Sequence, residues 1–333
     1  MVGRRILITG GLGFIGSYLA EHFLENGDRV TIVDSLVSNV VEPAFFDVKY
    51  PEVHIVQSSV ADHFATTPDL TGYDLFIHAA SLVGPASLID DAGSIGSDIV
   101  LSTACIIEQC RKADIPLLHF SSAEVYGRSG VLDEAHEIRV PPYYNARIEY
   151  ALAKLTSEAM ISNSQHRGLR AIVIRPFNVA GPRQSRAGGF VLPTFVQQAL
   201  GGRPLTVFGS GQQTRAFLGI DDLVQFVAQR IDNWPAEPFT IYNVGNPDNA
   251  TTIQALAERV IRLLGSRSTL VQVDPKSVYG PLYFEAESFE KVPAIGKARA
   301  LGWEPRQTLD DTIRQCAAYY RDHRDPRGRD ART

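Results

Sequence analysis

The chain has 333 residues, of which 44% are hydrophobic and 21% are charged, and its formal net charge is −5. This composition predicts a globular protein that buries a large core and contains more than one small domain. The negative net charge, with no basic run among aromatic residues, argues against nucleic acid as a partner. The sequence has no run of about 18 apolar residues, so we expect no membrane-spanning segment.

The first predicted element is a buried strand that leads into a glycine-rich turn. Residues 6–9 form the strand, Gly10, Gly13 and Gly16 follow, and residues 18–25 have helical periodicity. Glycines let the backbone approach a pyrophosphate, and the helix offers N–H groups and the positive end of its dipole. This order predicts a dinucleotide site, although a glycine turn with a purely structural role would use the same residues.

The second predicted strand, residues 30–33, ends at an acidic residue. Asp34 comes eighteen positions after Gly16, which is near the spacing at which a carboxylate accepts hydrogen bonds from an adenosine ribose. The same carboxylate would repel a 2′-phosphate. The sequence therefore predicts NAD, and not NADP, as the cofactor.

Strand and helix patterns continue to alternate through the first half of the chain. Further strands are predicted at residues 53–57, 75–78, 116–120 and 171–174, and further helices at residues 99–111 and 150–166. Such alternation predicts a parallel sheet with helices on both faces, a Rossmann-type doubly wound α/β fold. Ligands bind at the carboxyl ends of such strands, so the glycine turn, Asp34 and residues 121–126 should meet at one crevice.

The pattern changes after residue 181. Glycine and proline become frequent over residues 181–211, whereas residues 239–244 resemble a strand and residues 253–264 a helix. We therefore predict two domains that share the chain discontinuously. Residues 1–177 and 218–265 form the expected NAD-binding domain, residues 178–217 and 266–320 a smaller C-terminal substrate-binding domain, and residues 321–333 a flexible tail.

A tyrosine and a lysine are the main catalytic candidates. Tyr150 and Lys154 lie four positions apart, on one helical face. A tyrosine has a usual pKa near 10, and about 4 kcal/mol of differential stabilisation of the phenolate would bring it to about 7. The lysine and an oxidised nicotinamide are suitable sources of positive charge. Ser122, at the end of the fifth predicted strand, is a candidate to share a proton with the substrate, but serine is also a common cap there.

The three cysteines argue against metal and disulfide chemistry. Cys105, Cys110 and Cys316 have neither metal-ligand spacing nor the even number of a disulfide framework. Two of them lie in an apolar helical stretch, where buried thiols are common. We expect no metal site and a reduced, cytoplasmic location.

Seven motifs, taken together and in order, carry a family resemblance. They are residues 10–16, 78–80, 121–127, 150–154, 175–184, 209–215 and 301–305. With these motifs, the chain from about residue 4 to residue 310 resembles the extended short-chain dehydrogenase/reductases, in the branch of nucleotide-sugar epimerases, dehydratases and decarboxylases. The resemblance implies NAD-dependent oxidation at carbon 4 of a nucleotide sugar, which we expect to be UDP-linked, and a homodimer. The helical faces at residues 99–110 and 152–161 suit a dimer contact but are equally compatible with the chain's own core.

The resemblance also implies roles for individual residues. Catalytic roles fall to Ser122, Glu124, Tyr150 and Lys154. Cofactor contacts fall to Gly10, Gly13, Phe14, Ile15, Gly16, Asp34, Asp62, Ala79, Ala80, Tyr150 and Lys154. Substrate contacts fall to Arg147, Asn178, Val207, Arg215 and Lys291. A guanidinium fork suits the phosphate oxygens of the substrate, although a surface salt bridge is the simpler role for Arg215.

Two residues favour UDP-glucuronate decarboxylation as the reaction. Glu124 occupies a position where dehydratases and decarboxylases resemble one another in having a glutamate, which can exchange a proton at carbon 5. Arg147 matches the Arg-x-x-Tyr pattern of the decarboxylases, where a cation can hold the sugar carboxylate. The alternative role for Arg147 is that of a charge on the helix surface.

Other residues favour a nucleotide-sugar 4-epimerase, which is the second hypothesis, ahead of a hexose dehydratase. Ala123 replaces the aspartate of 4,6-dehydratases and the serine that is common in decarboxylases, and residues 80–85 lack the Pro-x-x-Tyr of decarboxylases. Lys291 is the remaining cation where the family normally has an arginine pair. A non-catalytic NAD-binding regulator is a further class, but Tyr150 and Lys154 are both present.

Overall fold

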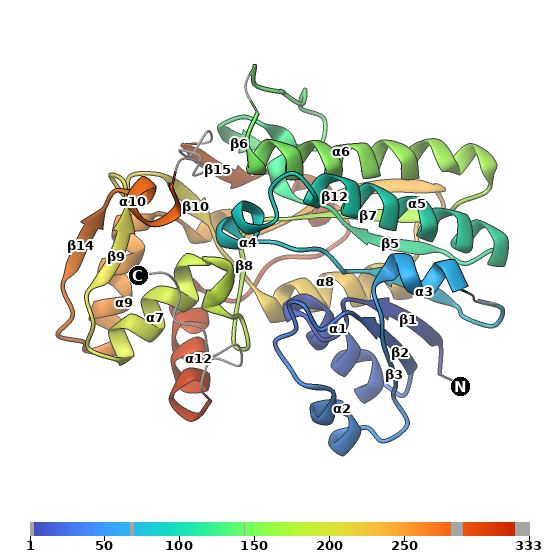
Figure 1. Cartoon of the computed structure of the whole chain (residues 1–333), viewed down its shortest axis with the longest axis horizontal. Coiled ribbons are helices and arrows are strands. Elements are labelled where there is room, and N and C mark those ends of the chain that lie inside the picture. The colour runs from blue at the N-terminus through green and yellow to red at the C-terminus, as the bar shows by residue number, and fades with distance from the viewer. Residues whose placement is uncertain (1–2, 67–69, 143, 281–288, 324–333) are drawn as a thin grey trace.

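A seven-stranded parallel sheet lies at the centre of the molecule (Figure 1). The computed structural model describes residues 3–66, 70–142, 144–280 and 289–323. The strand order is β12-β7-β5-β4-β1-β2-β3. These strands are β1 (Arg5–Thr9), β2 (Arg29–Asp34), β3 (His54–Gln57), β4 (Leu75–His78), β5 (Leu117–Phe120), β7 (Ala171–Pro176) and β12 (Phe239–Val244). The order reverses between β1 and β4, which confirms the predicted doubly wound fold.

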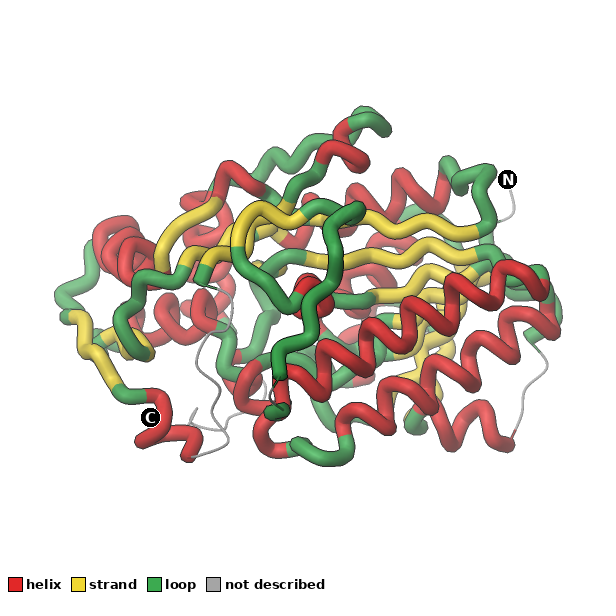
Figure 2. The backbone as a smooth tube through the Cα atoms, turned by 90° about the horizontal axis from the view of Figure 1, so that it is seen from above, coloured by secondary structure: helices red, strands yellow, loops and turns green. Residues whose placement is uncertain are grey.

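Helices cover both faces of this sheet (Figure 2). One face carries α1 (Phe14–Glu25), α2 (Pro43–Lys49) and α8 (Ile220–Asp232). The other carries α3 (Val60–Thr66), α5 (Ile95–Ala113) and α6 (Ala146–Ser164). Alternation along β1 supplies both layers, because Ile6 and Ile8 join one buried cluster and Leu7 joins the other. Strands with both faces covered are apolar throughout, which is why they are readable in the sequence.

A second core lies beside the sheet. It joins α7 (Val191–Leu200), α9 (Ile253–Leu264) and α12 (Leu309–Asp322) to the parallel pair β9 (Leu205–Phe208) and β14 (Leu270–Val273). α12 begins with a capping box: the Asp311 N–H donates to Thr308 Oγ1 at 3.2 Å, and the Asp311 carboxylate accepts from the Thr308 N–H.

Short strands connect the two cores. A four-stranded sheet has the order β13 (Ala250–Thr252), β10 (Thr214–Ala216), β15 (Glu290–Pro293) and β6 (Gly130–Leu132). Because β6 lies between β5 and α6 in the chain, this sheet ties the second core to the first. A smaller pair joins β8 (Val179–Ala180) and β11 (Leu218–Gly219). The remaining helical segments are α4 (Pro85–Asp90), α10 (Pro275–Tyr279), α11 (Gly296–Arg299), η1 (Ala123–Tyr126), η2 (Gln165–Arg167), η3 (Arg186–Gly188) and η4 (Pro247–Asn249).

The packing differs from the predicted domain division in two places. α9 is predicted to belong to the sheet domain, but it packs with α7 and α12 in the second core. Residues 266–320 are predicted to belong to the smaller domain, but Ile295, Ala298 and Trp303 pack into the sheet core. Of the predicted tail, Arg321 and Asp322 end α12, and residues 324–333 lie outside the described residues.

The apolar faces of α5 and α6 contribute to the core of their own chain. Ile99, Ile106 and Ile161 are buried, and Thr103 and Ser157 share a hydrogen bond of 2.9 Å between the two helices. Within the described ranges, no helix has the length and apolarity needed to cross a bilayer. The same residues contain no group of three or more His, Cys, Asp or Glu side chains suited to a metal ion.

Candidate active site

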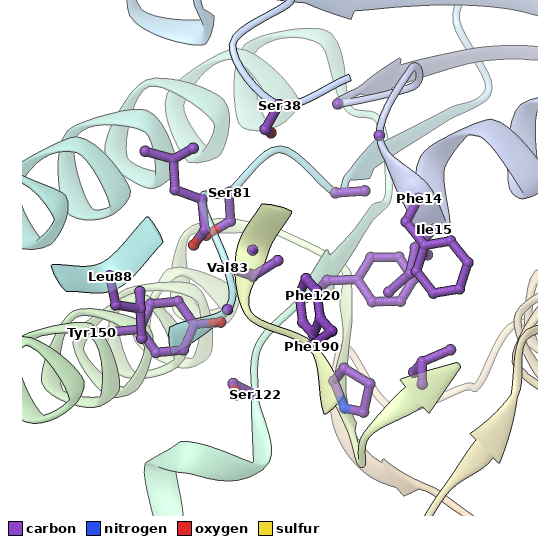
Figure 3. Close-up of a pocket in the computed structure, with 18 of the residues that line it drawn as sticks. Phe14, Ile15, Ser38, Ser81, Val83, Leu88, Phe120, Ser122, Tyr150 and Phe190 are labelled. Carbon is purple, nitrogen blue, oxygen red and sulfur yellow. The ribbon is translucent and has the colours of Figure 1, made fainter. Parts of the chain in front are cut away.

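A cavity of about 730 Å³ extends from the carboxyl ends of the sheet strands to the second core, a size typical of ligand pockets. Figure 3 shows part of it, with Phe14 and Ile15 on one side and Tyr150 and Ser122 on the other. Most predicted site residues line this cavity: Gly10, Gly13, Phe14, Ile15, Gly16, Asp34, Ala79, Ala80, Ser122, Glu124, Arg147, Tyr150, Lys154, Asn178, Arg215 and Lys291. Asp62 and Val207 do not.

The glycine turn has room for a ligand and none for side chains. Gly10 has φ +71°, and a Cβ atom there would lie 2.6 Å from the Ala80 backbone. A Cβ atom at Gly16 would lie 2.0 Å from the carbonyl oxygen of Gly10. Gly13 precedes α1 without a side-chain cap, so no side chain occupies the first N–H groups of that helix. The turn therefore fits the pyrophosphate of a dinucleotide.

Asp34 is held in place by the backbone at the end of β2. Its Oδ2 accepts from the Leu12 N–H and its Oδ1 from the Leu36 N–H, both at 2.9 Å. The carboxylate lies in the cavity wall, where it fits an adenosine ribose.

Asp62 differs from its predicted role as a cofactor contact. It is exposed on α3 and accepts a hydrogen bond of 2.7 Å from the Ser59 hydroxyl. Ser59, which the sequence does not single out, lines the cavity in its place. Val60 and Ala61, the first two residues of the helix, also line the cavity, whereas Asp62 does not.

Tyr150, Ser122 and Lys154 come together as predicted. The Tyr150 hydroxyl is hydrogen-bonded to Ser122, and Lys154 Nζ lies 5.8 Å from the centre of the tyrosine ring. Lys154 also donates to the Phe120 carbonyl at 2.9 Å. Burial raises the pKa of Tyr150, and it lowers the pKa of Lys154 to about 8. The phenolate therefore needs further positive charge, which an oxidised nicotinamide would supply.

A cluster of charges lies beside these three residues. Lys291 Nζ is 2.6 Å from Glu124 Oε1, and Arg147 Nε is 3.6 Å from Glu124 Oε2. These cations, with Arg215, lower the pKa of Glu124 to about 2 despite its burial. Burial and the nearby cations lower the pKa of Lys291 to about 8, although the negative charge of Glu124 acts to raise it. Arg147 thus lines the cavity beside Glu124 and is not a simple helix-surface charge.

The far end of the cavity belongs to the second core. Asn178 has φ +38° and donates to the Ala216 carbonyl at 2.9 Å, and Arg215 pairs in register with Lys291 across β10 and β15. Val207, a predicted substrate contact, is 1% exposed and packs inside the second core. Its neighbours Thr206 and Phe208 line the cavity, because alternate residues of a strand face opposite sides.

Two aromatic residues near the site, Phe190 and Tyr279, are not predicted from the sequence. Phe190 and Phe208 line the cavity, and Tyr279 packs edge-on against Phe208 with ring centres 5.5 Å apart. The sequence offers only weak signals for them, since each is one aromatic residue in an irregular stretch.

Comparison with known proteins agrees with this geometry. Residues 6–245 match the model of the NAD dependent epimerase/dehydratase family. The chain belongs to this family. NAD is accordingly its cofactor, and the glycine turn and Asp34 are the groups suited to hold it.

This family member has curated relatives that are named as decarboxylases. It is 29% identical over 327 residues to UDP-glucuronic acid decarboxylase 1 of Xenopus tropicalis, covering 96% of this chain and 72% of the relative. It is 28% identical to UDP-N-acetyl-alpha-D-glucosaminuronate decarboxylase of Bacillus cytotoxicus, and the match covers 96% of this chain and 98% of the relative. Among solved structures, UDP-glucose 4-epimerase of Thermotoga maritima has a TM-score of 0.82 at 23% identity, with 96% and 99% of the chains covered, and shows the same fold.

Proposed function

We propose that this protein decarboxylates a UDP-linked uronic acid, with UDP-glucuronate as the first candidate, through a 4-keto intermediate. The observation that carries this proposal is the pair of cations, Arg147 and Lys291, on either oxygen of Glu124. Within this trio, two cations face one carboxylate, which leaves a positive charge for the carboxylate of the sugar. The decarboxylase names of the two relatives support the same reaction.

Tyr150 and Ser122 are the proposed groups for the first step. Their hydrogen-bonded hydroxyls face the cavity, so Tyr150 can take the proton of the sugar's 4-hydroxyl while Ser122 bonds to that oxygen. Lys154, as an ammonium, stabilises the phenolate. When bound, NAD supplies an acceptor for the hydride of carbon 4 and a donor for its return.

Glu124, Arg147 and Lys291 are the proposed groups for the second step. Oxidation at carbon 4 makes the uronate a β-keto acid. The bond between carbons 5 and 6 breaks, carbon dioxide leaves, and the electron pair moves to the 4-oxygen. A proton then adds to carbon 5. The sugar carboxylate competes with Glu124 for the two cations, which raises the pKa of Glu124 and lets it exchange that proton.

We assign the nucleotide to the second core. Arg215 and Asn178 are the proposed diphosphate contacts, and Thr206 and Phe208 the proposed wall of the base pocket. The same proposal includes a homodimeric assembly and a cytoplasmic location. It also includes the two-domain division, with the packing changes described above.

The deciding experiment is mass spectrometry of products from UDP-glucuronate, UDP-glucose and UDP-N-acetylglucosamine in parallel. Loss of the mass of carbon dioxide from the uronate is the expected result. An altered sugar of unchanged mass would instead favour a 4-epimerase, the second candidate. The buried Ala123 favours that candidate, since it offers no acid at the position next to Ser122. Loss of water would indicate a dehydratase.

A further inference from the structure

A buried ion pair lies behind the proposed base. Glu158 follows Tyr150 and Lys154 on α6, at one helical turn per step. Its Oε2 accepts from Arg175 Nη2 at 2.6 Å and its Oε1 from Arg175 Nε at 2.9 Å. Both side chains are only 4% exposed. A buried carboxylate with this two-pronged partner has a fixed position.

Glu158 also holds the end of β5. The Ser121 hydroxyl donates to Glu158 Oε1 at 2.5 Å. Ser121 directly precedes Ser122, and Glu124 follows two positions later. One carboxylate therefore ties α6, which carries the tyrosine and lysine, to the segment that carries their partners.

Among the described residues, Glu158 is the anion whose charge acts on the buried Lys154. Lys154 is 2% exposed. His78 of β4 and His119 of β5 also face it, but burial keeps the pKa of both well below the usual histidine value, so they are neutral. Glu158 raises the pKa of Lys154, against the effect of burial.

Tyr150 has different neighbours. Ser122 is its hydrogen-bond partner, and Glu124 of η1 is the anion that acts on it, in the direction that opposes the phenolate. Lys154 Nζ lies 5.8 Å from the centre of the tyrosine ring, and its positive charge, together with that of bound NAD, acts against burial and Glu124 at this hydroxyl.

We propose that Glu158 is a positioning residue of this site, which keeps the buried Lys154 ammonium charged and so supports the phenolate of Tyr150. Arg175 fixes the orientation of that carboxylate. The inference rests on the proposed function for the role of Tyr150 as base. It concerns a proton equilibrium that can be measured without a sugar.

The test is a pH titration of Tyr150 in the NAD-bound protein without substrate. Phenolate absorbance is recorded, and the same titration of the Tyr150→Phe variant is subtracted. Glu158→Gln keeps the size of the side chain and an acceptor for Ser121 but removes the charge. Lys154 then loses its proton more readily, so the Tyr150 midpoint should rise by about one pH unit, which is a tenfold change in proton affinity.

Ser121→Ala is the matched control, because it removes the hydrogen bond and keeps the charge. We expect it to leave the midpoint unchanged. A wild-type midpoint in Glu158→Gln, or an equal shift in Ser121→Ala, would overturn the proposal. The acidic limb of kcat on UDP-glucuronate should move upward with the midpoint. If no decarboxylation occurs at all, the proposed function fails while the titration still decides the role of Glu158.

A second variant addresses folding. Glu158→Gln leaves Arg175 as a buried charge without its partner, which can destabilise the protein strongly. The double variant Glu158→Gln with Arg175→Met removes both charges. We expect the same upward shift of the midpoint in it. A return to the wild-type midpoint would mean that the lone arginine caused the change, and it would contradict the proposal.

Discussion

Lys291 gives the charge cluster a pH dependence that an arginine would not. Its ammonium, with a pKa near 8, is charged below that pH and neutral above it. We expect the KM for UDP-glucuronate to rise above pH 8, approaching about tenfold per pH unit, because a cation for the sugar carboxylate is lost. Lys291→Arg keeps the charge, and its KM should stay flat over the same range. Steady-state kinetics from pH 6.5 to 10 measures both, at about half-unit steps. An equal rise in the arginine variant would assign the titration to another group.

Glu124 should matter for the second step and not for the first. Glu124→Gln removes the group proposed to exchange the proton at carbon 5, so kcat for formation of the decarboxylated product should fall by about 100-fold or more. Proton removal by Tyr150 should continue, and the absorbance of the reduced cofactor should accumulate in a single turnover. Glu290→Gln is the control, since that neighbour of Lys291 is exposed. Loss of both steps in Glu124→Gln would contradict the division of roles.

Single residues were predictable where the signal is local. The glycine turn, and Tyr150 with Lys154, depend on spacing within one turn or one helix. Val207 does not line the cavity, because a shift of one residue along a strand changes the face. The contact between Glu124 and Lys291 joins residues far apart in the chain, on η1 and β15. No pattern within either segment indicates it.

At the scale of elements, the turn between β1 and α1 has no room for an added methyl group at Gly10. Gly10→Ala places a side chain at φ +71° and against the Ala80 backbone, a strain of about 1–3 kcal/mol. We expect a lower melting temperature and at least about tenfold weaker NAD binding, since that strain distorts the pyrophosphate site. Isothermal titration with NAD measures the second effect. Gly296→Ala is the control, because a Cβ atom there meets nothing within 4 Å. Unchanged NAD affinity in Gly10→Ala would contradict the assigned role of the turn.

The capping box of α12 should contribute measurably to stability. Thr308→Ala removes the hydroxyl that accepts from the Asp311 N–H, and we expect the free energy of unfolding to fall by about 1 kcal/mol. Thr308→Ser keeps the hydroxyl and should stay close to the wild type. Urea denaturation at constant m-value compares the three proteins. No difference between the alanine and serine variants would show that the cap is irrelevant to stability.

The strands of the central sheet are predictable from the sequence, and the shortest strands are not. The strands of the central sheet are apolar because both faces are covered. The strands β8, β10, β11 and β13 have only two or three residues each, too few for any periodicity. α7 was missed because glycine and proline flank it, yet Leu192, Phe195 and Ala199 have helical spacing and are buried.

At the scale of the whole molecule, the chain should unfold in one transition. The segments β6, α11 and Trp303 connect the two cores, because the chain passes from one core to the other around them. Both tryptophans, Trp234 and Trp303, lie in or against the sheet core, whereas α7, α9 and α12 belong to the other. Tryptophan fluorescence and far-ultraviolet circular dichroism should therefore give the same midpoint in urea. Two separate midpoints would mean that the cores unfold independently.

The position of Lys291 on β15, so late in the chain, has a consequence for how the protein is made. Ribosomes add about 5–20 residues per second, so Lys291 emerges on the order of ten seconds after Lys154. During that interval Glu124 and Arg147 already exist, while the lysine that will contact the carboxylate has not been synthesised. The charge cluster is therefore completed only late in synthesis, just before Ile295, Ala298 and Trp303 complete the sheet core.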